Sequence, residues 1–118
     1  MTNLTKKKCV PCEGGVPPLK RAEAEELLKE LNDWALIDDA HLLAKSFRFK
    51  NFVTTMEFVN EVAAIAEEEG HHPTLVTEWG KVTVVWWSHR IRGVHRNDFI
   101  MAAKTNQVYL MQTRQITS

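Results

Sequence analysis

The chain has no surplus of either charge, no long apolar run and almost no cysteine. Lysine plus arginine total 15 and aspartate plus glutamate total 15, so the formal net charge is zero. A protein that binds duplex nucleic acid normally carries a clustered basic surplus, and we therefore expect no nucleic-acid partner. No segment approaches the roughly 20 consecutive apolar residues of a membrane-spanning helix, so we expect no membrane partner either.

The cysteine content points to a reducing compartment. The only cysteines, Cys9 and Cys12, are too close together to staple a fold, and no apolar segment of a secretory signal follows the first lysines. We therefore expect a cytoplasmic protein. A single CxxC in a Gly- and Pro-rich stretch lacks the context of a zinc ribbon or a thioredoxin-type motif, which favours unreactive thiols, with metal binding or redox sensing as alternatives.

Composition and periodicity predict a flexible N-terminal tail at 1–18 and a single domain at 19–118. Hydrophobic periodicity predicts a helix, two strands, a helix, two strands and a last helix in that order. The helices are expected at 19–31, 52–69 and 98–112, and the strands at 34–37, 42–49, 74–77 and 82–87.

Hairpins rather than βαβ crossovers link these strands in the predicted order. We therefore predict an α+β fold, with a four-stranded antiparallel sheet and three helices packed on one of its faces. The opposite sheet face would remain open, and the chain has four tryptophans. Both features favour burial of that face in a homo-oligomer.

Three of the five histidines, His71, His72 and His89, flank the second predicted hairpin. Gly80 suits the positive φ of a tight turn between its strands. A turn at 80–81 would place His72 opposite His89, whereas a turn at 79–80 would pair His72 with Trp87. Either register leaves His89 roughly 5 to 8 Å from the histidine pair, so we predict that the three imidazoles gather.

Gathered imidazoles indicate proton transfer, because their unperturbed pKa of about 6.5 makes both protonation states accessible near neutral pH. Pro73 favours an extended His72, so His71 and His72 are expected to point to opposite sides. Glu67 lies four residues before His71 and could share its side of the helix end. The alternatives are polar hairpin residues without chemistry and a metal site. Neighbouring residues of an extended chain seldom converge on zinc, which disfavours the metal site.

The pattern Glu67-x3-His71-His72-Pro73-x5-Trp79-x9-His89-x8-Asp98 resembles the signature of the pterin-4a-carbinolamine dehydratases. The resemblance extends from about Leu19 to Tyr109 and includes Trp34 and the segment 47–52. The segment 8–15, which contains both cysteines, resembles the tail of bacterial and plant-type members.

The resemblance implies a lyase that dehydrates 4a-hydroxytetrahydropterin to quinonoid dihydropterin, recycling the pterin of aromatic amino acid hydroxylases. It also implies a homodimer or homotetramer that needs no metal and no organic cofactor. By analogy, the catalytic residues would be His71, His72 and His89, with His72 acting at the 4a-hydroxyl. The residues expected to bind substrate or orient a histidine are Glu67, Pro73, Ser88, Arg90 and Trp34. Structural roles are expected for Trp79, packing at the hairpin, and Asp98, capping the last helix.

Two other functions are compatible with the resemblance. Animal relatives bind a homeodomain transcription factor, so a protein-interaction or transcriptional-cofactor module is one alternative. The bacterial-type tail makes this alternative weaker. An accessory role in molybdenum-cofactor metabolism, with dehydration secondary, is the other.

Overall fold

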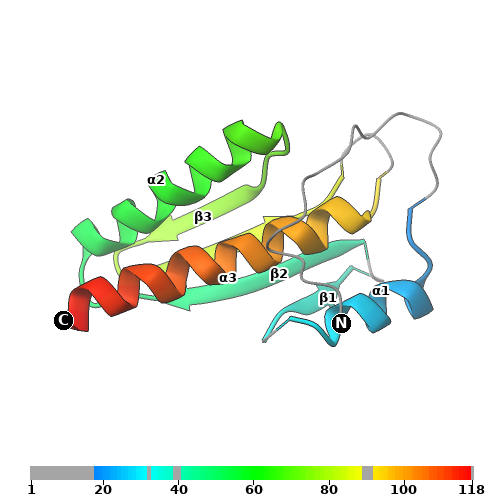
Figure 1. The fold of residues 1–118 in the computed structure, drawn as a ribbon, viewed down its shortest axis with the longest axis horizontal. Coiled ribbons are helices and arrows are strands. Elements are labelled where there is room, and N and C mark those ends of the chain that lie inside the picture. Colours follow the sequence, from blue (N-terminus) through cyan, green and yellow to red (C-terminus); the bar gives the residue numbers. More distant parts are fainter. Residues whose placement is uncertain (1–17, 32, 39–40, 89–91, 118) are drawn as a thin grey trace.

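The structure is a computed structural model that describes residues 18–31, 33–38, 41–88 and 92–117, with side chains described up to residue 112. The helices and strands follow one another in the predicted order (Figure 1). They are α1 (Arg21–Leu28), β1 (Ala35–Ile37), β2 (Leu42–Arg48), α2 (Phe52–Glu69), β3 (Thr74–Glu78), β4 (Lys81–Trp86) and α3 (Arg96–Thr117). The predicted α+β fold is therefore confirmed.

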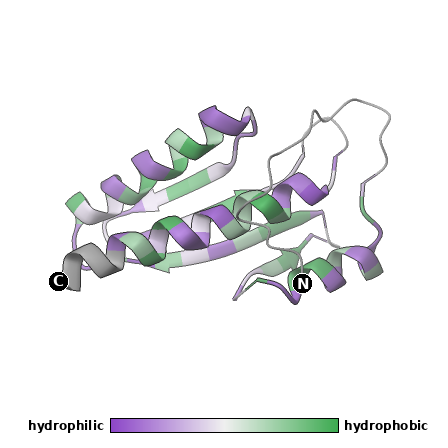
Figure 2. Cartoon of the chain, viewed as in Figure 1, coloured by the Kyte–Doolittle hydropathy of each residue, from purple (hydrophilic) through white to green (hydrophobic). Residues whose placement is uncertain are grey.

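The four strands form one antiparallel sheet in the order β1-β2-β4-β3, so two hairpins meet where β2 pairs with β4. Alternate side chains of β2 and β4 are buried beneath the helices: Leu43, Phe47, Val82, Val84 and Trp86. α2 and α3 lie over the same side of the sheet in Figure 1, and Figure 2 shows hydrophobic and hydrophilic residues alternating along both helices. On the opposite face Ser46 and Thr83 join β2 to β4 through a 2.9 Å hydrogen bond between hydroxyls. The core therefore lies between the helices and one sheet face.

The helix α2 has clear start and stop signals in the sequence. The Asn51 side chain accepts a 2.8 Å hydrogen bond from the backbone N–H of Thr54, as an N-cap residue does. Buried Phe58, Val62 and Ala66 then recur every four residues and form the face that packs on the sheet. Gly70 ends the helix with a φ of 64°, in the left-handed region that favours glycine.

No helix in the described part of the chain is long and apolar enough to cross a membrane.

The hairpin of β3 and β4 corrects one expectation about Gly80. Thr77 pairs with Val82, which places the turn at residues 79–80 and selects the second of the two predicted registers. Gly80 does not have a positive φ; among the described glycines only Gly70 does. A Cβ at position 80 would lie 2.9 Å from the backbone oxygen of Phe49, whose N–H donates to the Gly80 carbonyl. Glycine is needed there for the close approach of two backbones.

The last helix begins at Arg96, two residues earlier than predicted, and continues beyond residue 112 to Thr117. The early start has a local cause, because Nδ1 of His95 accepts a 3.1 Å hydrogen bond from the backbone N–H of Asn97. Histidine is not one of the usual N-cap residues, so the sequence pattern did not reveal this cap.

Pro18, the last residue of the expected N-terminal tail, and Leu19, the residue after it, lie against the segment that follows β4. The expectation for residues 1–17 lies outside the described residues, but Pro18 is described. The Leu19 N–H donates a 2.9 Å hydrogen bond to the carbonyl oxygen of Val94. Gly93 forms an isolated antiparallel bridge with Ser88. A Cβ built on Gly93 would lie 2.7 Å from Cβ of Pro18.

We expect Gly93→Ala to lower the free energy of unfolding by about 1–3 kcal/mol, because the proline ring must move to admit the new methyl group. Urea unfolding followed by circular dichroism measures the change. Pro18→Gly in the same chain removes the colliding carbon, so the double variant should recover part of the loss. Strictly additive effects of the two substitutions would contradict this contact as the cause.

Candidate active site

The end of α2 places the two adjacent histidines. The N–H of Gly70 donates to the carbonyl of Glu67 at 3.3 Å, and the N–H of His71 donates to the carbonyl of Ala66 at 3.1 Å. This pair of bonds is the Schellman motif that a left-handed glycine allows. The chain therefore leaves the helix in a fixed direction, with His71 and His72 in the two positions just before Pro73 and β3.

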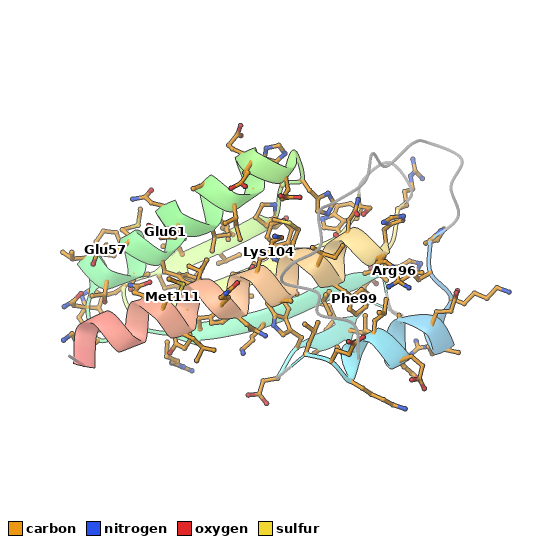
Figure 3. The ribbon with its side chains drawn as sticks, viewed as in Figure 1. Glu57, Glu61, Arg96, Phe99, Lys104 and Met111 are labelled. Atoms are coloured by element: carbon orange, nitrogen blue, oxygen red, sulfur yellow. The ribbon has the colours of Figure 1, made fainter. Side chains whose placement is uncertain are left out.

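His71 points to the helix side and contacts a buried carboxylate. Its Nε2 lies 2.6 Å from Oδ1 of Asp98, which is fully buried, and the His71 side chain is only 12% exposed. The other carboxylate oxygen, Oδ2, accepts hydrogen bonds from Oγ of Ser88 and from the backbone N–H of His95, both at 2.8 Å. The segment between α2 and β3, the segment after β4 and the start of α3 therefore meet at Asp98. Arg96 and Phe99 mark this end of α3 in Figure 3, with Met111 at the far end.

Trp86 supports the His71 ring from one side and was not among the predicted site residues. The two rings stack with centroids 5.7 Å apart and an interplanar angle of 14°. Trp86 is fully buried, and its Nε1 donates a 3.1 Å hydrogen bond to Oγ1 of Thr105 on α3. Val82, Val84 and Trp86 alternate on the buried side of β4, and the ring contact shows that Trp86 meets His71 there.

His72, unlike His71, is exposed to solvent. Its Nε2 lies 3.0 Å from Oε1 of Glu67, and the side chains are 61% and 79% exposed, respectively. The predicted divergence of the two histidines agrees with this difference in burial. The sequence placed Glu67 on the side of His71 if the helix extended that far. The helix ends at Glu69, and Glu67 contacts His72 instead. The geometry thus contains one buried and one exposed pair of imidazole and carboxylate.

The remaining predicted residues are distributed differently. Pro73 is half-buried beside the histidines. Trp34 is in the core, where its ring lies edge-on to Phe47 and its Nε1 donates to Asn106, about 12 Å along α3 from Asp98 by helical rise. Trp79 is 65% exposed, so the expected packing of its ring at the hairpin is not seen within this chain. His89 and Arg90 lie outside the described residues.

The pKa of Lys45, on β2, is shifted from its ordinary value. Burial lowers the pKa of Lys45, and the nearby Asp33 opposes that effect. The Lys45 ammonium donates a 3.2 Å hydrogen bond to Oδ1 of Asn106 and lies 4.8 Å from the centroid of the Phe47 ring. These contacts tie β2 to α3.

The described side chains contain no group of three or more His, Cys, Asp or Glu residues arranged to hold a metal ion. The chemistry that the described groups themselves offer is proton transfer. The imidazoles of His71 and His72 each have one ring nitrogen paired with a carboxylate and a second nitrogen that can exchange a proton.

Comparisons with known proteins agree with the family that the motif indicated. The family model for pterin 4 alpha carbinolamine dehydratase matches residues 17–108, well over half of the chain. Two curated relatives carry the name "Putative pterin-4-alpha-carbinolamine dehydratase", the first with the numeral 1 added. The protein from Cupriavidus pinatubonensis is 53% identical over 89% of this chain and 90% of its own length. The protein from Chlorobium luteolum is 50% identical over 92% of this chain and 97% of its own.

Two solved structures share the fold. The crystal structure of a transcriptional coactivator/pterin dehydratase from Brucella melitensis is 33% identical with a TM-score of 0.74, covering 78% of this chain and 98% of that one. A pterin dehydratase-like protein identified as a RuBisCO assembly factor in the alpha-carboxysome is 22% identical with a TM-score of 0.58, covering 66% and 90%. The second likeness concerns the fold alone.

Proposed function

Because the chain belongs to the pterin 4 alpha carbinolamine dehydratase family of lyases, we propose that it removes water from 4a-hydroxytetrahydropterin to give quinonoid dihydropterin. This reaction would recycle the pterin that aromatic amino acid hydroxylases use. The observation that carries the proposal is the pair of adjacent histidines that follow α2 in the chain, each in contact with its own carboxylate. The proposal places the reaction in the cytoplasm.

Dehydration requires two proton transfers at neighbouring atoms of the pterin. The 4a-hydroxyl must gain a proton to leave as water, and N5 must lose one so that the C4a–N5 double bond can form. His72 is the acid that acts at the hydroxyl, and the Glu67 carboxylate 3.0 Å away orients its ring. His71 and His89 contact the pterin and share in the proton transfer.

Further residues of the motif region complete the proposed substrate site. Pro73, Ser88 and Arg90 line the pterin, whereas Trp34, the other residue expected there, is buried in the core and bonded to Asn106. Ser88 is 1% exposed and already bonded to Asp98, so its contribution to the pterin site is made from a fixed position. The reaction proceeds with protein side chains as its acids and bases, and the proposal includes no metal or organic cofactor.

The decisive experiment is a stopped-flow assay on chemically generated 4a-carbinolamine. The substrate also dehydrates spontaneously, so the measured quantity is the increase in rate that the protein causes. The proposal expects that increase to be proportional to protein concentration. A wild-type protein that leaves the spontaneous rate unchanged would overturn the proposed function.

The proposal also includes a homodimer or homotetramer. The sheet face opposite the helices carries exposed apolar side chains on both edge strands, with Ile37 of β1 at 42% and Val76 of β3 at 51% exposure. Burial of such a face favours association. Sedimentation velocity over a range of concentrations should therefore give a mass two or four times that of the chain. A monomer at every concentration would exclude this part of the proposal.

A protein-interaction module is the second candidate function, and the name of the Brucella melitensis structure includes a coactivator. Far from the histidines, the exposed side chains of Val53, Trp79 and Met111 come from segments that hydrogen bonds hold together: Thr55 to the Trp79 carbonyl, and Gln112 to the Thr54 carbonyl. Affinity capture from the native cell should then return a stoichiometric partner that Val53→Asp loses and His72→Ala keeps. The dehydratase hypothesis predicts that Val53→Asp keeps dehydration activity and that His72→Ala loses it.

A further inference from the structure

The Asp98 carboxylate is a buried acceptor with three donors around it. Its side chain is fully buried, Ser88 and the backbone N–H of His95 approach Oδ2, and His71 approaches Oδ1. A backbone N–H can only donate a hydrogen bond. The position in the first turn of α3 also favours a negative charge, because the peptide dipoles of a helix point their positive ends there. Asp98 therefore accepts all three hydrogen bonds as a carboxylate.

This arrangement determines which nitrogen of neutral His71 carries the proton. A neutral imidazole has one N–H and one lone pair, and the nitrogen that faces a carboxylate must carry the N–H. In His71 that nitrogen is Nε2, 2.6 Å from Asp98. The lone pair is then on Nδ1, for which the described residues provide no hydrogen-bond partner. Stacking on Trp86 fixes the plane of the ring, so Nδ1 also has a fixed direction.

No buried carboxylate fixes the tautomer of the neighbouring His72. Its carboxylate partner Glu67 is 79% exposed, and such a surface pair contributes little free energy. His72 can therefore exchange protons with solvent in either tautomer. His71 is therefore a proton acceptor with a fixed tautomer, whereas His72 is a proton donor that solvent can protonate again.

We propose that Asp98, supported by Ser88, is a positioning residue that fixes the Nε2–H tautomer of His71 and so makes Nδ1 of His71 the base that takes the proton from N5. The proposal rests on the proposed function. Protonated His72 gives its proton to the 4a-oxygen, the C4a–O bond breaks and water leaves. The electron pair of the N5–H bond forms the C4a–N5 double bond while Nδ1 of His71 takes the proton. His71 then returns its proton to solvent and His72 regains one.

Asp98→Asn tests the tautomer with almost no change in shape. In this variant the amide oxygen accepts from Ser88 and His95, which leaves the amide NH₂ facing Nε2 of His71. Nε2 must then accept, and the N–H moves to Nδ1, where a base is needed. The corresponding exchange in a Ser-His-Asp triad leaves the geometry intact and lowers kcat about 10⁴-fold. We expect kcat to fall by about 10²- to 10⁴-fold, with KM changed far less.

The experiment combines the stopped-flow assay with long-range ¹H–¹⁵N NMR of the substrate-free protein. The wild-type protein should show the Nε2–H pattern for His71, assigned through loss of its signals in His71→Gln, and Asp98→Asn should show the Nδ1–H pattern. The matched control is Asp38→Asn at an exposed position with a φ of 51°, which asparagine tolerates. The control should leave both kcat and the His71 signals unchanged.

Two results would overturn the positioning role. One is an Nδ1–H pattern for His71 in the wild-type protein, a result that does not depend on the folding of Asp98→Asn. The other is an Asp98→Asn protein that shows the shifted tautomer and keeps the wild-type kcat. Failure of the proposed function is distinguishable from both, because it leaves the wild-type protein without any effect on dehydration whatever the NMR pattern of His71.

Discussion

Replacement of His72 and His89 together by alanine should lower the dehydration rate by at least about 10²- to 10⁴-fold, the usual loss on removal of an acid/base group. In the proposed reaction His72 protonates the leaving hydroxyl, and His89 shares in proton transfer. His72 is 61% exposed and its one described ion pair is on the surface, so its loss should not unfold the chain. The stopped-flow assay measures the rate, and circular dichroism checks that the fold is intact.

His41→Ala is the control for the double variant. His41 is an exposed residue of the turn between β1 and β2, where its Nδ1 lies 2.7 Å from the Asp38 carbonyl oxygen. The His41→Ala variant loses an imidazole but no proposed acid or base, so its dehydration rate should stay close to that of the wild type. Near-wild-type dehydration by the His72/His89 double variant would defeat the assignment of these residues.

The element order was predictable because each element has a local signal. Apolar residues at spacings of three and four, an asparagine before Phe52 and a glycine after Glu69 define α2 almost residue by residue. The register of β3 and β4 was not predictable, because two turns around Gly80 satisfy the same alternation. The contact that explains the glycine is with Phe49, which lies 31 positions away and leaves no trace in the local pattern. Tertiary contact therefore determines the turn.

The candidate site shows the same division between local and tertiary information. Asp98 was predicted as a helix cap, and one of its oxygens does accept the N–H of His95. The other oxygen faces His71, 27 positions earlier in the chain. That contact depends on how closely α3 approaches the segment between α2 and the start of β3, which no spacing within either segment encodes. For the same reason Trp86 could be placed on the helix side of β4 but not against the His71 ring.

Phe47→Ala should cause the largest loss of stability, about 3–5 kcal/mol from the free energy of unfolding. Phe47 is 2% exposed, and its ring centroid lies 5.9 Å from that of Trp34, 4.9 Å from that of Phe58 and 5.0 Å from that of Tyr109. Alanine would leave a cavity among three aromatic rings. Because domains of this size are stable by only about 5–15 kcal/mol, a substantial part of the total is at risk.

Urea unfolding measures this loss, and the midpoint should fall by more than about 1 M. Phe52→Ala is the matched control, since Phe52 is 48% exposed and the same truncation there should cost less than about 1 kcal/mol. Phe47 pairs with Val82, about 13 Å along β4 from Trp86, so the folded variant should still accelerate dehydration. Equal losses for the two variants would mean that the aromatic cluster is not the centre of the core. A loss of activity in folded Phe47→Ala would mean that the histidine site depends on this cluster, which the separation along β4 argues against.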